Sequence, residues 1–138
     1  MLDTIQLDNI LFLDIETVPE MEHFSELDTD FQELFAHKTQ YQRKDEVSPE
    51  EFYERAGIWA EFGKIVCISV GYFTQKSGER QFRVTTFQGD EERLLLDFSN
   101  LINNHFNLPQ HVMCGHNVKE FDFPYIARRM LIHGIKIP

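Results

Sequence analysis

Two acidic side chains, Asp14 and Glu16, stand at the end of the apolar run at positions 10–16. Side chains alternate along a strand, so both carboxylates would project from the same face. Ionising two neighbouring carboxylates is costly without a compensating charge, which a divalent cation would supply. Oxygen ligands favour a hard ion, Mg²⁺ or Mn²⁺, over zinc. The pattern predicts a metal site; the alternative is a strand that simply ends in solvent.

A second polar segment, residues 115–122, follows a short apolar run and ends on Asp122. Open α/β proteins place their sites at the carboxyl ends of strands. We therefore expect Asp122 to face Asp14 and Glu16 across the edge of a sheet. Two alternatives stay open at this point: Asp122 could be a helix N-cap, and Asn117 could satisfy only the amides of its own loop.

The elements that must position these residues alternate along the chain. Apolar and alternating runs predict strands at 10–16, 64–73, 81–87 and 111–114, the first of them covered on both faces. Apolar residues at helical spacing, with start and stop signals, predict helices at 24–35, from Ser48, at 91–106 and at 120–133. This order predicts an α/β fold in which a mixed β-sheet is flanked by helices. We expect a single domain over 1–138, with a helical insertion at about 20–60.

Composition excludes several classes of protein. The chain has 138 residues, of which 42% are hydrophobic, so a folded core is available. No apolar run approaches the roughly 18 residues of a membrane span, and the N-terminus lacks the features of a signal peptide. Cys67 and Cys114 lie in apolar runs and are predicted to be buried thiols. We therefore expect a cytoplasmic protein with no membrane partner.

The charge is uneven. Lys and Arg number 13 against 23 Asp and Glu, a net −10, yet residues 1–37 hold ten of the acids and no Lys or Arg. Phosphate binding normally depends on Lys and Arg, so a uniformly acidic chain would repel nucleic acid. Here the excess is local, and a solvated acidic helix accounts for most of it.

The two polar segments together resemble a known family. Residues 12–17 (Phe-Leu-Asp-Ile-Glu-Thr) are similar to the first motif of the DEDD superfamily of 3′-5′ exonucleases, which is DnaQ-like and has a ribonuclease H-like fold. Residues 117–122 (Asn-Val-Lys-Glu-Phe-Asp) are similar to its second motif. The chain most resembles the exonuclease domain of family B DNA polymerases and related free-standing bacterial nucleases. The order of elements between the motifs also matches, so the resemblance covers nearly the whole chain.

The resemblance implies a function and roles for individual residues. Asp14, Glu16 and Asp122 would be the catalytic ligands of two Mg²⁺ or Mn²⁺ ions, which cleave a phosphodiester at the 3′ end of nucleic acid. The substrate would be single-stranded, with DNA favoured over RNA, and the product a 5′-nucleotide. The terminal nucleotide would be contacted by four residues: Thr17, Val18, Asn117 and Phe121.

One part of the family pattern is missing. The family has a third motif, a Tyr or His followed by a fourth carboxylate, and no Asp or Glu follows Asp122. Tyr125 and His133 are present without an acid four residues later. We therefore expect the C-terminal part of the fold to be missing, and the 138-residue chain to be nearly inactive although its longer parent is an exonuclease.

Two other functions fit parts of the sequence. A non-catalytic module of the same fold could bind nucleic acid or a protein, using the acidic N-terminal region and the helical insertion as its interface. A phosphatase of the haloacid dehalogenase type also ends an apolar strand on a nucleophilic Asp, where this chain has Asp14. That family has Asp where this chain has Glu16, and residues 117–122 have no place in it, so we rank it third.

Overall fold

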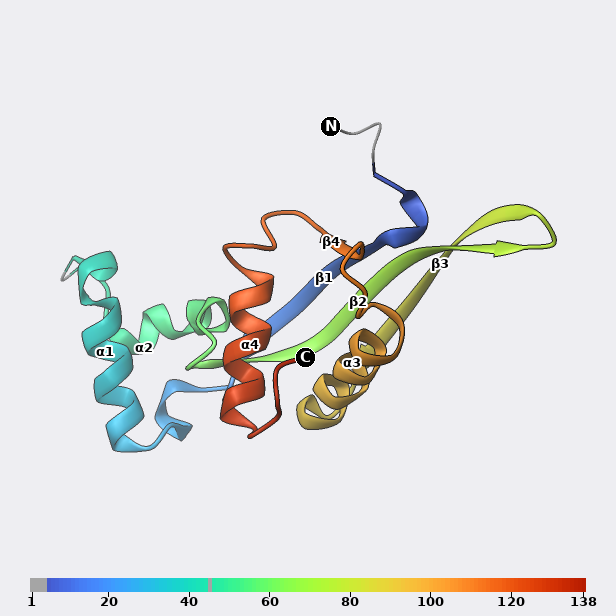
Figure 1. Ribbon diagram of the computed structural model, residues 1–138. Helices are drawn as coiled ribbons and strands as arrows, with labels where there is room; N and C mark the ends of the chain where they lie inside the picture. The colour runs from blue at the N-terminus through green and yellow to red at the C-terminus, as the bar shows by residue number, and fades with distance from the viewer. Residues whose placement is uncertain (1–4, 45) are drawn as a thin grey trace. The chain divides into compact units, whose positions relative to one another are not determined.

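The structure is a computed structural model that describes residues 5–44 and 46–138. Figure 1 shows the elements along the chain. The strands are β1 (Ile10–Pro19), β2 (Gly63–Lys76), β3 (Glu79–Gln88) and β4 (Val112–Cys114). The α-helices are α1 (Thr29–Arg43), α2 (Pro49–Phe52), α3 (Glu91–His105) and α4 (Asp122–Ile132). Short 3₁₀ helices form at Leu7–Asn9 (η2), Phe24–Glu26 (η3) and Tyr53–Ile58 (η4).

The four strands form one mixed sheet in the order β3-β2-β1-β4. β2 and β3 are antiparallel from Cys67 opposite Gln88 to Lys76 opposite Glu79, and β1 runs parallel to β4 with Ile10 opposite Val112. A two-residue turn joins β2 to β3, and both of its residues, Ser77 and Gly78, adopt positive φ. This type of turn matches the twist of the two strands and so favours the hairpin. The predicted α/β fold, a mixed sheet flanked by helices, is confirmed.

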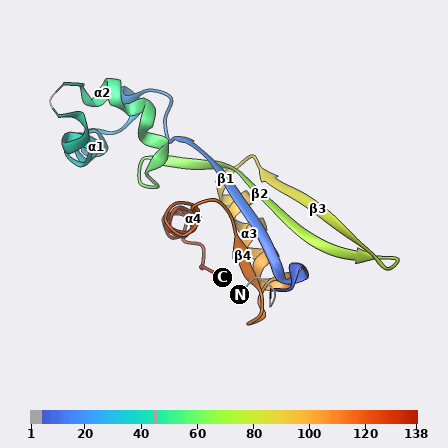
Figure 2. The same ribbon diagram turned by 90° about the horizontal axis from the view of Figure 1, so that it is seen from above.

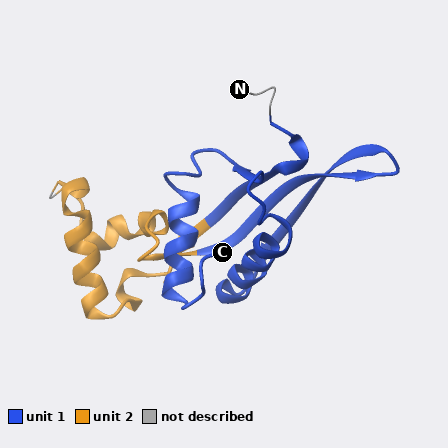
Figure 3. Ribbon diagram, in the orientation of Figure 1, with its two compact units in different colours: residues 1–16, 65–138 blue, residues 17–64 orange. Residues whose placement is uncertain are grey.

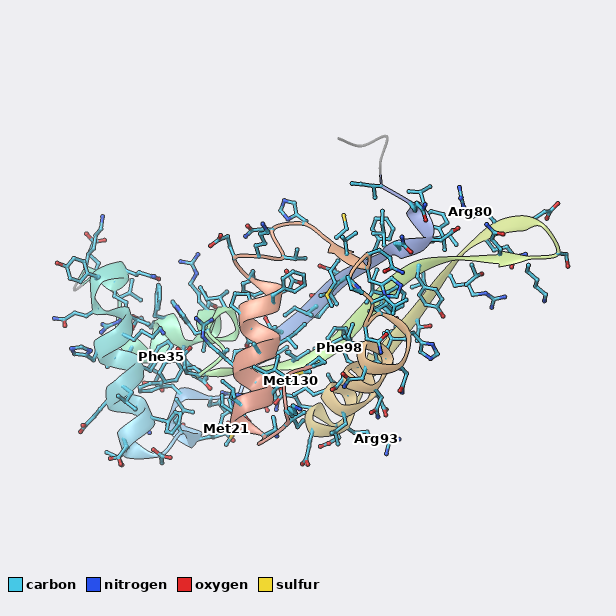
Figure 4. All side chains as sticks on the ribbon, in the orientation of Figure 1. Met21, Phe35, Arg80, Arg93, Phe98 and Met130 are labelled. Atoms are coloured by element: carbon cyan, nitrogen blue, oxygen red, sulfur yellow. The ribbon has the colours of Figure 1, made fainter. Side chains whose placement is uncertain are left out.

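Helices α3 and α4 lie on one side of this sheet (Figure 2). On that side Leu11 and Leu13 are buried, and Phe87 of β3 packs edge-on against Phe98 of α3. Met113 reaches the same side and lines an apolar cavity of about 370 Å³ with residues of both helices; Phe98 and Met130 from this lining are labelled in Figure 4. Residues of β1, β3 and β4 thus line the helix-covered side of the sheet.

The opposite side of the sheet corrects two expectations. β1 was expected to be covered on both faces, yet Phe12 is only half-buried and Asp14 is exposed. Cys114, opposite Phe12 in the register, is exposed rather than buried, and Cys67 is half-buried. The physical reason is that α3 and α4, the helices of residues 65–138, both lie on the other side of the sheet, so an apolar run alone does not show how many faces are packed.

The chain divides into two compact units, residues 1–16 with 65–138, and residues 17–64 (Figure 3). Within residues 17–64, Phe35 is fully buried and makes ring contacts with Phe24, Tyr53, Trp59 and Phe62. Each such aromatic pair adds about 0.5–1.5 kcal/mol beyond the area it buries. This aromatic cluster gives residues 17–64 a core of their own.

The first helix of this unit differs from its predicted bounds. A single helix was expected over 24–35, but Phe24 belongs to η3 and α1 begins only at Thr29. Asp28 supplies the start signal, since its side chain accepts a hydrogen bond from the backbone N–H of Phe31 at 2.9 Å. The predicted capping box at Ser48 is confirmed, with Ser48 and Glu51 each bonded to the other's backbone.

A buried ion cluster ties the helices of the larger unit to the sheet. The Glu91 carboxylate, at the first residue of α3, accepts hydrogen bonds from the backbone N–H of Ile65 at 2.7 Å and from Arg129 Nε at 2.8 Å. His133 Nε2 lies 2.7 Å from the same carboxylate. Arg129 is 4% exposed and Glu91 is 9% exposed. One side chain therefore joins β2, α3 and α4.

Burial alone would raise the pKa of the Glu91 carboxyl, but the hydrogen bonds that it accepts outweigh burial, Arg129 making the largest of these contributions. The pKa is therefore lowered. A carboxyl whose pKa is lower in the folded state contributes stability above its unfolded pKa and loses it as the pH falls through the folded value. The cluster should weaken in acid.

We expect Glu91→Gln to lower the free energy of unfolding by about 3 kcal/mol, because it leaves the Arg129 charge buried without its partner. Urea unfolding at neutral pH measures this loss, and repeating it at decreasing pH should show a smaller pH dependence for the variant than for the native chain. Asp97→Asn is the control: it breaks the exposed pair with Arg93 and should cost no more than about 0.5 kcal/mol. Equal losses from the two variants would contradict the role given to the cluster.

In the part of the chain that the structure describes, no helix is both long and apolar enough to cross a bilayer.

Candidate functional site

Asp14 and Glu16 are held by the alternation of β1. Leu13 and Ile15 are buried at 3% and 6% exposure, whereas Asp14 and Glu16 are exposed. The apolar side chains fix the strand against the helix-covered side and leave both carboxylates on the other side. The two acids are therefore accessible to a ligand from solvent. They lie on the same face of β1, as the alternation of side chains along a strand predicts.

Asp122 is the first residue of α4, and its side chain points back to β1. Its Oδ1 accepts a hydrogen bond of 3.2 Å from the backbone N–H of Ile15, which lies 107 positions earlier in the chain. That N–H sits between Asp14 and Glu16, so this one bond brings the two polar segments together. Asp122 is 3% exposed. The N-cap position belongs to Phe121, which makes no side-chain cap, so capping does not account for Asp122.

The environment of Asp122 makes its carboxyl harder to ionise than that of an ordinary aspartic acid. Burial raises the pKa of the Asp122 carboxyl above its ordinary value, and the charge of Asp14 raises it further. The hydrogen bonds from the backbone N–H groups of Asp122 and Ile15, together with the nearby His116, act in the opposite direction without cancelling the rise. A carboxylate that is buried beside another carboxylate is a group that a cation would stabilise.

The loop between β4 and α4 approaches β1 closely because of a glycine. A Cβ on Gly115 would stand 2.4 Å from the carbonyl oxygen of Leu13 and 2.3 Å from the Val118 side chain. Asn117 then adopts a positive φ of 54°, a conformation that Asn tolerates better than most residues. Its carbonyl accepts hydrogen bonds from the N–H groups of Glu120 and Phe121, both at 3.1 Å, which turns the chain into α4.

The three acids predicted to bind metal, Asp14, Glu16 and Asp122, do not form one tight cluster. The charge of Asp14 acts on the pKa of Asp122, but within residues 5–44 and 46–138 no group of three or more Asp, Glu, His or Cys side chains is close enough to form a metal site. Repulsion between carboxylates opposes such a cluster when no cation is present. The donor set itself, three carboxylates, is chemically suited to a hard divalent cation.

The four predicted substrate contacts lie in two places. Thr17 and Val18 continue β1 and are half-buried. Asn117 is exposed in the loop, and Phe121 is half-buried with its ring 5.4 Å from that of Tyr125. Sequence reasoning gave no role to Gly115; the glycine at the end of an apolar run, just before the polar segment, was the available signal.

A hollow of about 320 Å³ adjoins Asp14 on the side of the sheet away from the helices. Phe12, Phe82 and Cys114 line it together with Gly115, and the Phe82 ring is 52% exposed. The Phe12 and Phe82 rings meet edge-on at 5.8 Å. The carboxylate of Asp14 therefore stands at the border of an apolar surface.

Gly115→Ala should push the loop away from β1, because the new methyl group has no room against Leu13. We expect a loss of about 1–3 kcal/mol in unfolding free energy, measured by urea denaturation, as for other overpacked sites. Lys119→Ala, an exposed change in the same loop, should be nearly neutral. An unchanged Gly115→Ala variant would show that the close approach is not required.

Asp14→Asn should lower the pKa of Asp122, since it removes a negative charge that raises it. An NMR titration of the Asp122 side-chain carbon in cation-free buffer measures this directly. Because the Asp122 pKa is raised on folding, its stabilising effect is present at low pH and is lost as the pH rises through the folded value. Asp122→Asn should therefore remove part of the fall in stability between acid and neutral pH. A pKa for Asp122 that does not respond to Asp14→Asn would contradict the proximity of the two groups.

Comparison with known proteins now identifies the family. The family model described as DNA polymerase family B, exonuclease domain, matches residues 9–138 and so includes both polar segments. Searches of curated proteins and of solved structures returned no match. The match agrees with the mixed α/β sheet, consistent with a ribonuclease H-like fold, and it favours a nuclease over the phosphatase alternative. The chain belongs to the exonuclease-domain family of family B DNA polymerases.

Proposed function

We propose that this chain forms the metal-binding part of a 3′-5′ exonuclease site that acts on single-stranded ends, with DNA preferred to RNA. Membership in the family makes it a nuclease domain whose substrate is nucleic acid. The proposal adds the polarity, the strand preference and the residues. It treats 1–138 as one exonuclease domain in which residues 20–60 are a helical insertion.

The hydrogen bond between Asp122 and Ile15 is the observation that carries this proposal. It supports a common site for two motifs that are far apart in the sequence. Asp14 and Glu16 are open to solvent on one side of β1, while the Asp122 carboxyl is held in place from the other direction. A phosphodiester could therefore reach the exposed pair while the buried acid keeps a fixed position.

Asp14, Glu16 and Asp122 would hold two divalent cations, Mg²⁺ or Mn²⁺. Bound there, the cations would activate a water molecule and neutralise the charge on the scissile phosphate. Asp122 would hold the cations as a carboxylate, the form that its burial disfavours. Cation binding should therefore release protons where the free carboxyl is still partly protonated.

Four residues would contact the 3′-terminal nucleotide: Thr17 and Val18, which follow the acidic pair on β1, and Asn117 and Phe121, which precede Asp122. Asn117 is exposed, so its amide could bind a nucleotide directly. No Lys or Arg occurs in residues 1–37, so phosphate binding must use cations held by the acids or the bases elsewhere in the chain.

The decisive experiment measures Mn²⁺ binding and nuclease activity on the same variants. Asp14→Asn and Asp122→Asn should each weaken Mn²⁺ binding, followed by electron paramagnetic resonance, by at least about tenfold. Any cleavage of a labelled single strand that requires Mg²⁺ or Mn²⁺ should fall in parallel and should release 5′-nucleotides from the 3′ end. Because no acid follows Asp122, we expect the native rate to be low.

Glu120→Gln is the matched control, since Glu120 is an exposed acid only two residues before Asp122. It should change neither Mn²⁺ binding nor cleavage. Tight Mn²⁺ binding that survives both aspartate substitutions would refute the site. Cleavage that starts from the 5′ end would refute the polarity and leave the metal site standing.

A non-catalytic module of the same fold is the second candidate. The observation in its favour is that Asp14, Glu16 and Asp122 do not form a three-ligand cluster in the described residues. Such a module would bind a single strand without cutting it, and its binding would not depend on Mg²⁺. Binding that is unchanged by Asp14→Asn, with no detectable cleavage under any divalent cation, would favour this reading.

A further inference from the structure

Helix α1 is apolar on more than the side that it buries. Phe35 and Thr39 are fully buried in the core of residues 17–64. Phe31, Leu34 and Tyr41 are also large and apolar or aromatic, yet they are 41%, 56% and 94% exposed. Positions 31, 34, 38 and 41 follow one another at steps of three and four, so they share one side of the helix. A surface helix normally has one apolar stripe, which packs on the core, and polar residues on its other side. The exposed apolar residues of α1 are therefore not explained by the packing of this unit.

This side of α1 borders a hollow of about 390 Å³, which we call the outer groove; its lining residues are Phe31, Leu34, His37, Lys38, Glu61 and Phe62. The rings of Phe31 and Phe62 meet edge-on at 6.0 Å and form its apolar part. Lys38 Nζ bonds to Glu61 Oε1 at 3.1 Å, so these two charges neutralise each other. A cavity of about 150 Å³ holds a benzene ring, so the outer groove has room for more than one apolar side chain.

The unit that contains the outer groove, residues 17–64, is strongly acidic. Residues 17–64 contain 12 Asp and Glu and only five Lys and Arg, so they carry −7 of the net −10 of the chain. Asp28, Asp30 and Glu33 are exposed at the beginning of α1. A field of this sign attracts cationic ligands and repels phosphate. An apolar groove on an acidic unit is complementary to a ligand that is apolar along one side and basic around it.

We propose that the outer groove binds a basic amphipathic helix from a partner protein, with apolar side chains of the partner packed on the exposed Phe31 and Leu34, beside the buried ring of Phe62. Nucleic acid and anionic membranes are disfavoured because both would bring phosphate to an acidic surface. A second copy of this chain is disfavoured because its own residues 17–64 also carry a net charge of −7 and would be repelled. The proposal is independent of the catalytic site, which involves none of these residues.

The test uses the full chain and three synthetic peptides as long as α1. One peptide has leucines at helical spacing with lysines elsewhere, the second replaces every lysine by glutamate, and the third is a scramble of the first without an apolar side. Only the first should bind in fluorescence anisotropy. Leu34→Gln should weaken its binding about tenfold, as expected for the loss of one buried leucine contact. Asp30→Asn with Glu33→Gln should weaken binding and reduce its salt dependence.

Matched controls separate the groove from general stickiness. Ile58→Gln removes another apolar side chain that is 50% exposed, and Glu50→Gln removes an acid from α2; neither should change binding. Circular dichroism verifies that each variant is folded. Equal binding of the scrambled peptide, or no effect of Leu34→Gln, would overturn the proposal. Self-association, or binding of a single-stranded oligonucleotide or anionic vesicles, that is lost in Leu34→Gln would assign the groove to a different occupant.

Discussion

A hydrogen bond joins the distant parts of the chain that form the candidate site: the backbone of Ile15 donates to the side-chain carboxyl of Asp122. The donor is a backbone N–H, so a change of the Ile15 side chain does not remove it. Because Ile15 lies within a strand, the direction of this N–H is fixed. The acid at the start of α4 is therefore held at the point of β1 where two further acids emerge. The bond is buried and consequently shielded from water, which strengthens it. Two features of the loop before α4, the close contact of Gly115 with β1 and the left-handed turn at Asn117, help to keep these two partners opposite each other.

Much of this arrangement could be predicted from sequence, because it depends on local periodicity. The alternation around Asp14 and Glu16 placed both on one face, and the apolar runs located all four strands of the sheet. The predictions that failed concern what lies across space. An apolar run could not show that only one side of β1 is covered, so Phe12 and Cys114 were expected to be buried. The helix expected at Phe24 begins instead at Thr29, because Asp28 caps it there. The helical spacing of apolar residues extends back into η3, so spacing alone did not locate the start of the helix.

Residues 17–64 show how charge and fold can serve different purposes in one chain. Their aromatic core, centred on Phe35, is dense enough to form a compact unit, while their surface concentrates most of the negative charge of the chain. An acidic surface repels a polyanionic substrate such as nucleic acid. Such a surface in a nuclease-family domain would either direct the nucleic acid elsewhere or bind a different ligand. The exposed side of α1 suggests the second of these. The binding surface that we propose would then lie on residues 17–64, a compact unit within a nuclease-family domain.

The ion cluster at Glu91 has a consequence for how the larger unit comes apart. Helix α4 is fastened near its start through Asp122 to β1, and near its end through Arg129 to the first residue of α3. A helix anchored at both ends does not fray independently of its surroundings. Opening the acidic site by local unfolding would therefore require breaking a buried ion pair as well, so backbone amides of α4 would exchange with solvent only when the larger unit opens cooperatively.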